Sequence, residues 1–178
     1  MLGGRDGERR SYPEIVDAIR THGARAEEDA AELFRRMVFN ILVSNVDDHL
    51  RNHGFLWGGE GGWRLSPAYD LNPVPRDMKP AVLSTRILGE DGTCSIELAL
   101  EAAPAFLLRP AAARSIVREV SAAAVGWRRE AVALRLGRRD IERMASAFEH
   151  PEADRARRLA DIAPSPPATK RRTSGSER

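Results

Sequence analysis

The spacing of three polar residues, Asp47, Asn52 and Asp70, constrains this chain more than any other feature of its sequence. Asp47 and Asn52 lie in the run Ser44-Asn45-Val46-Asp47-Asp48-His49-Leu50-Arg51-Asn52, and Asp70 ends the run Leu65-Ser66-Pro67-Ala68-Tyr69-Asp70. Between them, residues 53–57 and 63–65 are typical of short strands, and the glycine-rich segment 58–62 is typical of a tight connection. A hairpin turns the chain back on itself, so we expect Asp70 to lie beside Asn52.

The same three residues suit one kind of chemistry. Asp-x-x-x-x-Asn, a short hairpin and a second Asp is the arrangement of the catalytic loop and metal loop of a protein kinase. Phosphoryl transfer needs a carboxylate that orients the attacking hydroxyl and accepts its proton, and Asp47 fits this role. It also needs Mg²⁺, which prefers hard oxygen ligands, and Asn52 and Asp70 supply an amide and a carboxylate. The sequence therefore predicts Asp47 as the base and Asn52 and Asp70 as metal ligands.

Over residues 39–52 and 63–70 the sequence resembles the HipA-like serine/threonine kinases of bacterial toxin–antitoxin systems. The similar region spans roughly residues 11–150 and corresponds to the C-terminal lobe of that family. Arg51 stands where the family usually has a lysine, which keeps the charge. The resemblance implies ATP and Mg²⁺ as cofactors, a protein substrate, and a HipB-like antitoxin as partner. Asn45, His49 and Arg51 are expected to support the catalytic loop.

The nucleotide-cradling half of a kinase has no match within these 178 residues. The only lysines are Lys79 and Lys170, both after Asp47, and Gly3-Gly4-Arg5-Asp6-Gly7 lacks the glycine pattern of a phosphate loop. We therefore expect these residues alone to bind Mg-ATP weakly and to need a separately encoded N-lobe for turnover. The alternative is a catalytically inactive remnant or interaction module.

A metallohydrolase is a less favoured alternative. Asp47, His49, His53 and Asp70 offer oxygen and nitrogen ligands suited to a transition metal. This interpretation does not explain the position of Asn52. Each aspartate also has a plainer interpretation as a helix cap or a loop residue.

Several neighbours of the motifs are expected to have structural roles only. Asp48 is interpreted as an ordinary loop residue. Trp63 and Tyr69 are predicted to lie in the core.

Hydrophobic periodicity predicts a mainly α fold with one small β-hairpin. The resemblance implies that this fold is a kinase-like C-terminal lobe, a helical bundle with the hairpin at the catalytic and metal loops. Residues 79–95 remain ambiguous. Leu134 and Leu136 are expected to continue a helix as far as Gly137. The core is predicted to come from residues 33–42, 116–120 and 141–148. The expected helices are 12–22, capped by Ser11, then 26–43, 97–103, one from Pro110, and a last one from Asp140.

Composition fits one globular domain, predicted at residues 11–162: 42% of residues are hydrophobic and 30% are charged. We expect no membrane association and a cytoplasmic location, because no apolar run approaches a membrane span and Cys94 is the single cysteine. Cys94 is expected to be buried. Residues 1–10 and the basic tail 163–178 are predicted to be disordered. The net charge of +2 is too small to indicate nucleic-acid binding, except weakly through that tail.

Overall fold

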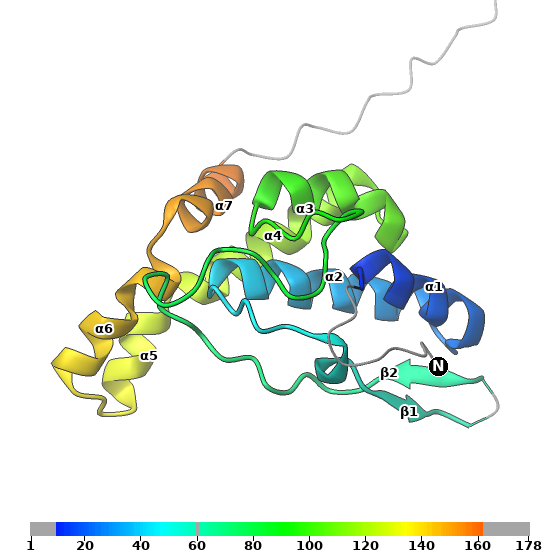
Figure 1. Cartoon of the computed structure of the whole chain (residues 1–178), viewed down its shortest axis with the longest axis horizontal. Coiled ribbons are helices and arrows are strands. Elements are labelled where there is room, and N and C mark those ends of the chain that lie inside the picture. Colours follow the sequence, from blue (N-terminus) through cyan, green and yellow to red (C-terminus); the bar gives the residue numbers. More distant parts are fainter. Residues whose placement is uncertain (1–9, 60, 162–178) are drawn as a thin grey trace, which may run out of the picture.

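A computed structural model describes residues 10–59 and 61–161. The predicted tail 163–178 and nearly all of the predicted N-terminal segment 1–10 lie outside the described residues. The mainly α fold with one small hairpin is confirmed (Figure 1). The elements are α1 (Tyr12–His22), α2 (Ala26–Leu42), the 3-10 helix η1 (Leu50–Asn52), β1 (Phe55–Trp57), β2 (Trp63–Leu65), α3 (Ile96–Ala102), the 3-10 helix η2 (Ala103–Phe106), α4 (Pro110–Val125), α5 (Trp127–Ala133), α6 (Arg138–Phe148) and α7 (Pro151–Asp161).

Helix α2 forms the centre of the molecule, with α1 and the hairpin on one side and α4 on the other (Figure 1). The apolar residues of its inner face, namely Leu33, Phe34, Met37, Ile41 and Leu42, are completely or almost completely buried. Burial of each such side chain contributes about 1.5–3 kcal/mol before conformational entropy is counted. The predicted stripe of α2 is therefore confirmed as the core, and its position fixes where the loop that follows it begins.

Helix α1 begins and ends at the residues that its sequence predicts, a Ser11 cap and Gly23. Glu14 accepts a hydrogen bond from the backbone N–H of Ser11 at 3.0 Å, as in a capping box. The helix ends at Gly23, where the chain meets the hairpin: the N–H of Ala24 donates to the carbonyl of Trp63 at 2.8 Å. Gly62 has φ 104°, and a Cβ there would lie 2.6 Å from the carbonyl oxygen of His22. Only glycine fits this close approach between hairpin and helix.

Strands β1 and β2 pair antiparallel with Phe55 opposite Leu65. Trp57 and Trp63 contact each other edge to face across the pair, with ring centroids 5.4 Å apart. The prediction that Trp63 and Tyr69 lie in the core is wrong, because they are 38% and 45% exposed. A sheet of two short strands has one face without a covering layer, so large side chains on that face remain at the surface.

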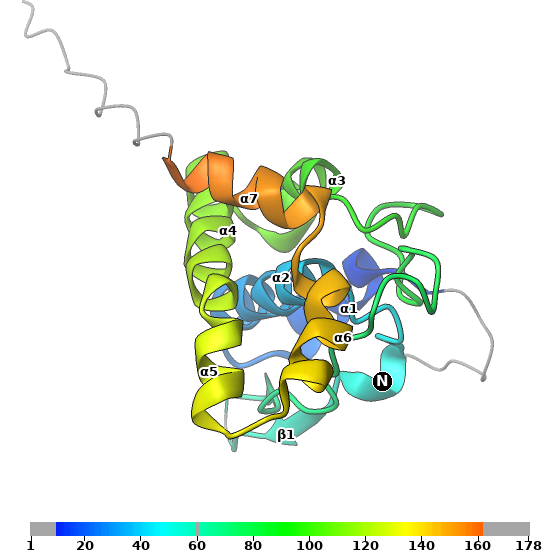
Figure 2. The same cartoon turned by 90° about the vertical axis from the view of Figure 1, so that its left-hand side faces the viewer.

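The C-terminal third differs most from the predictions. Helix α5 ends at Ala133, and Leu134 and Leu136 are 75% and 51% exposed rather than part of a longer helix. Helix α6 begins at Arg138, two residues before the predicted start at Asp140. Helix α7, which the sequence did not indicate, packs against α4 (Figure 2). Its buried residues Ala153 and Ala156 have small side chains, which are too weakly apolar for the sequence to show a hydrophobic periodicity there.

Two further expectations concern Cys94 and membranes. Cys94 is 4% exposed, which confirms that it is buried, and burial raises the pKa of its thiol to about 11. None of the described helices is long and apolar enough to cross a membrane.

His150 joins the end of α2 to the start of α7. Its Nε2 lies 3.1 Å from the carbonyl oxygen of Leu42, and its Nδ1 accepts the backbone N–H of Ala153 at 3.3 Å. This pattern suits a neutral ring with the proton on Nε2. Burial, aided by the charge of Arg76, lowers the pKa of His150 below its usual value.

We expect the stability of the chain to fall on acidification through His150. The unfolded chain takes up a proton near the ordinary histidine pKa of about 6.5, whereas the folded ring does so only at lower pH. The free energy of unfolding should therefore decrease as the pH falls below about 6.5. Urea unfolding across this range measures it, and His150→Gln, which cannot titrate, should show a flatter pH dependence. Identical slopes for parent and variant would contradict the assignment.

Candidate active site

Asn52 and Asp70 lie side by side, as the predicted hairpin requires. Asn52 ends η1 and is 5% exposed, and its side-chain N–H donates to Oδ2 of Asp70 at 3.2 Å. The other carboxylate oxygen of Asp70 accepts a hydrogen bond from the side chain of Asn72 at 2.6 Å. The hairpin thus brings an amide and a carboxylate together at one end of β1 and β2. Their role as metal ligands stays a prediction.

The loop that carries Asp70 is attached to η1 by its neighbour. The hydroxyl of Tyr69 donates to the carbonyl oxygen of Arg51 at 2.5 Å. A Cβ on Gly54 would lie 3.2 Å from that hydroxyl, so the glycine leaves room for the tyrosine. Asp70 itself has φ 57°, in the left-handed region that few residues other than glycine adopt. This conformation turns the carboxylate towards Asn52, and the surrounding contacts hold it there.

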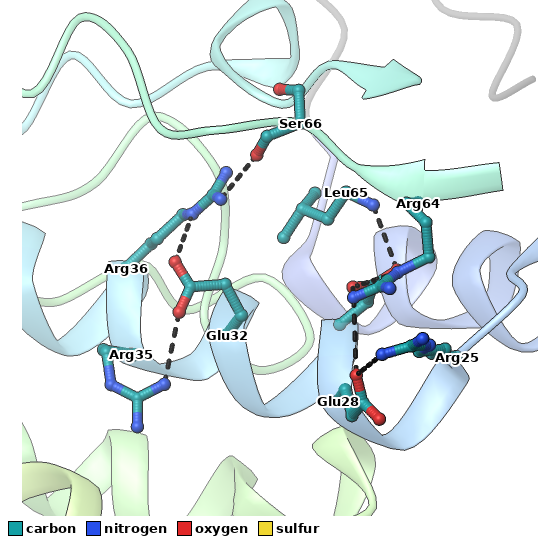
Figure 3. A network of polar contacts seen from close by, with 9 residues as sticks. Arg25, Glu28, Glu32, Arg35, Arg36, Arg64, Leu65 and Ser66 are labelled. Atoms are coloured by element: carbon teal, nitrogen blue, oxygen red, sulfur yellow. Dashed lines mark hydrogen bonds and ion pairs between the residues drawn. The ribbon is translucent and has the colours of Figure 1, made fainter. Parts of the chain in front are cut away.

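A polar network fixes the start of the same loop on α2 (Figure 3). Arg36 is 6% exposed, and its guanidinium donates to Glu32 at 3.0 Å and to the carbonyl oxygen of Ser66 at 2.6 Å. About two turns before Arg36, the carboxylate of Asp29 accepts hydrogen bonds from the guanidinium of Arg64 at 2.9 Å and from the N–H of Leu65 at 3.0 Å. The C-terminal end of strand β2 and the residue after it are therefore tied to α2, the helix that delivers the preceding loop.

Asp47 is exposed and has a different partner from the Asn52–Asp70 pair. Its side chain is 65% exposed and forms an ion pair with Lys79, with 3.5 Å between Oδ2 and Nζ. An exposed pair of this kind contributes little to stability, at most about 1 kcal/mol. Asp47 is therefore an exposed carboxylate whose ion pair adds little to the stability of the fold.

Asp48, the next residue, is completely buried. The hydroxyl of Tyr12 in α1 donates to its Oδ2, and Nε2 of His53 lies 3.2 Å from its Oδ1, within ion-pair distance. The ring of His53 also contacts that of Tyr12 edge to face. Burial and the neighbouring Asp48 raise the pKa of Tyr12 well above its usual value. The interpretation of Asp48 as an ordinary loop residue is therefore wrong: it links α1, the loop and the residue after η1.

The three predicted loop-supporting residues have different surroundings. The side-chain N–H of Asn45 donates to the side-chain oxygen of Asn40 in α2 at 2.9 Å. Nε2 of His49 lies 3.3 Å from the guanidinium of Arg51, at the surface of the loop. Their contribution to catalysis stays a prediction.

A segment that the sequence left ambiguous also supports the loop. The N–H of Ser84 donates to the carbonyl of Val46 at 3.1 Å, and the N–H of Thr85 donates to that of Asp48 at 2.8 Å. Leu83 and Ile87 anchor this segment in the core with no exposed area. One sequence signal was available for Tyr12: a tyrosine in an apolar stripe needs a partner for its hydroxyl. The sequence offered no comparable signal for Lys79 or for residues 83–87.

The ligand set of the alternative metallohydrolase is not assembled. His53 is turned towards Asp48, and His49 is beside Arg51. Among the described residues, no group of three His, Cys, Asp or Glu side chains is placed to hold a metal ion.

Comparisons with known proteins agree with these motifs. A family model described as "HipA-like C-terminal domain" matches residues 2–127. A Haemophilus influenzae protein named "Putative kinase" is 31% identical over 90 residues, which are 48% of this chain and 26% of that protein. "Putative kinase Y4dM" of Sinorhizobium fredii is 46% identical over 43 residues, 24% of this chain and 10% of that protein. The matches thus span about a quarter or less of the length of these relatives.

A solved structure shares the fold. It is the complex of HipA, HipB and operator DNA from the toxin–antitoxin system of Shewanella oneidensis MR-1. The match has a TM-score of 0.62 at 16% identity and covers 90% of this chain and 39% of that one.

Proposed function

Because this chain belongs to the HipA-like C-terminal domain family, we propose that it is the catalytic lobe of a protein serine/threonine kinase that transfers the γ-phosphoryl group of ATP. The observation that carries this proposal is the approach of Asn52 to Asp70, at 3.2 Å, together with an exposed Asp47 on the loop that carries Asn52. A fold that only needed these polar residues for stability would have no reason to leave Asp47 in solvent while it buries Asp48.

In this function Asp47 is the residue that meets the substrate hydroxyl. It accepts the hydroxyl proton as the oxygen attacks phosphorus, and it orients that oxygen. Lys79, 3.5 Å from its Oδ2, is a positive charge beside the point where the hydroxyl would bind. The buried Asp48 contacts Tyr12 and His53 and so anchors the loop to the core, while the neighbouring Asp47 remains at the surface.

Asn52 and Asp70 are the residues that would hold Mg²⁺, and their chemistry fits the ion. One offers an amide oxygen and the other a carboxylate, both hard ligands, and Mg²⁺ is commonly held by few protein groups with water and phosphate completing its shell. When bound, Mg²⁺ neutralises phosphate charge. Asn72 and the bond from Tyr69 to Arg51 orient the Asp70 loop.

The remaining parts of a complete kinase are proposals about a longer assembly. The nucleotide-cradling loop and its lysine would come from an N-lobe, and a HipB-like antitoxin would be the partner, as in the assembly named for the Shewanella structure. A protein serine or threonine is the substrate. The competing proposal, an inactive remnant that serves as an interaction module, gives the opposite result in the following test.

We expect Mn²⁺, used as a paramagnetic substitute for Mg²⁺, to broaden the NMR signals of the Asn52 and Asn72 side-chain amides at millimolar concentration. The physical reason is that both amides lie against the Asp70 carboxylate. Asp70→Asn should remove the broadening because it removes the charge that attracts the ion.

Asp77→Asn is the matched control, since Asp77 is an exposed aspartate in the same loop region, and it should leave the broadening unchanged. Broadening that persists in Asp70→Asn, or that never appears in the parent chain, would favour the inactive module.

A further inference from the structure

Helices α5 and α6 form a hairpin that projects from one corner of the molecule, away from α1 and the β-hairpin (Figure 1). Its base is well braced. Trp127 stacks on Phe148 with ring centroids 4.5 Å apart, and Arg128 pairs with Glu142 at 2.9 Å and with Glu149 at 2.6 Å. The hairpin is therefore a firm projection whose far end makes little contribution to the core.

The far end, residues 132–143, is called the α5–α6 tip. Three of its apolar side chains are largely exposed, since Val132, Leu134 and Leu136 are 64%, 75% and 51% exposed, whereas Ile141 is buried. The turn that presents them is ordered, because the N–H of Leu134 donates to Glu130 and that of Leu136 donates to Ala131, at 2.9 and 3.0 Å. Because most of their apolar surface remains in water, these three side chains contribute little to the stability of this chain.

The charges of the tip are also unusual. Arg135, Arg138, Arg139 and Arg143 are exposed, and none of the residues that the structure describes forms an ion pair with them. The acidic groups nearby are Asp140 and Glu142, and Glu142 is already paired with Arg128. Arg138 and Arg139 begin α6, where the positive end of the helix dipole disfavours a cation. Helix stability therefore does not explain these arginines.

Apolar side chains with unpaired arginines around them resemble the centre and rim of a protein interface. We propose that the α5–α6 tip is a docking surface for an acidic protein segment that carries its own apolar side chains. Charge complementarity indicates that the partner is negatively charged, since the tip has an excess of unpaired positive charge. A nucleic acid would pair with the arginines but would leave the leucines in water, so the aliphatic side chains favour a protein. The tip lies beyond residue 127, where the family match ends.

The test uses the full chain and a fluorescent helical peptide with leucines at i, i+3, i+4 and i+7 and glutamates elsewhere. We expect saturable binding of this peptide and none of the same peptide with lysines in place of glutamates. Arg138→Gln with Arg139→Gln, and separately Leu134→Ser with Leu136→Ser, should each weaken binding about tenfold or more. The control is Arg109→Gln with Arg114→Gln, two exposed arginines of the α4 region, which should leave binding unchanged.

Two further ligands test for other kinds of partner: duplex DNA for a nucleic acid, and vesicles of phosphatidylcholine with phosphatidylserine for a membrane. Tighter binding of either one, lost in the arginine variant, would overturn the proposal in favour of that partner. Equal binding of the acidic peptide by the parent and both tip variants, or no binding at all, would also overturn it. None of these outcomes depends on kinase activity.

Discussion

Ile41→Asp and Met37→Asp are each expected to abolish the folded state. Both side chains have no exposed area, and they lie on the face of α2 that packs against the rest of the core. Either substitution removes a buried apolar side chain and places a carboxylate where no cation is available to pair with it. A loss of more than about 4 kcal/mol is expected, against a total stability of about 5–15 kcal/mol for a domain.

Circular dichroism melts measure this effect. Ala122→Asp introduces the same residue at an exposed position of α4 and is the matched control. It should retain a cooperative transition close to that of the parent chain. A cooperative, unshifted melt of Ile41→Asp would show that α2 is not the central helix, and the support for the loop that follows it would be lost as well.

Neighbouring aspartates are expected to behave in opposite ways. Asp48→Ala should lower the free energy of unfolding by roughly 3 kcal/mol, because it leaves the buried hydroxyl of Tyr12 without its acceptor and removes the carboxylate beside the ring of His53. Asp47→Ala should change it by less than about 1 kcal/mol, since Asp47 is exposed and loses only a surface ion pair. Urea denaturation of both variants measures the difference.

The effects on kinase activity should be the reverse of those on stability, with the larger loss at Asp47 and the smaller loss at Asp48. In the chain joined to an N-lobe, such as the N-terminal portion of the Haemophilus influenzae relative, Asp47→Asn should reduce radiolabel transfer about 10²–10⁴-fold while Mg-ATP binding remains. Asp70→Asn should weaken nucleotide binding as well. Asp48→Asn keeps the shape of the side chain and one acceptor for Tyr12, so it should retain more transfer than Asp47→Asn. Equal stability losses at positions 47 and 48 would contradict the roles assigned here, as would full transfer by Asp47→Asn.

The sequence alone determined the parts of this protein that depend on local pattern. The stripe of α2, the Ser11 cap of α1 and the glycine-rich hairpin follow from periodicity and from backbone preferences, which neighbouring residues specify. The approach of Asn52 to Asp70 was also predictable, because a short hairpin leaves the chain no other path between them. The motif identified Asp47 because its spacing to Asn52 is a property of the chain and not of the fold.

Tertiary structure decided what depends on residues distant in the sequence. By residue type Asp48 cannot be told from Asp47 in the sequence. It is buried and connects separate parts of the chain only because Tyr12 of α1 and His53 pack against it in the fold. Residues 83–87 support the loop through backbone hydrogen bonds, and the pattern of side chains in the sequence does not predict such bonds. Leu134 and Leu136 continue a helical pattern, yet the chain turns at Arg135, with φ 59°, and leaves them in solvent. Local preference specifies helices and turns, whereas burial and exposure are set by what packs against them.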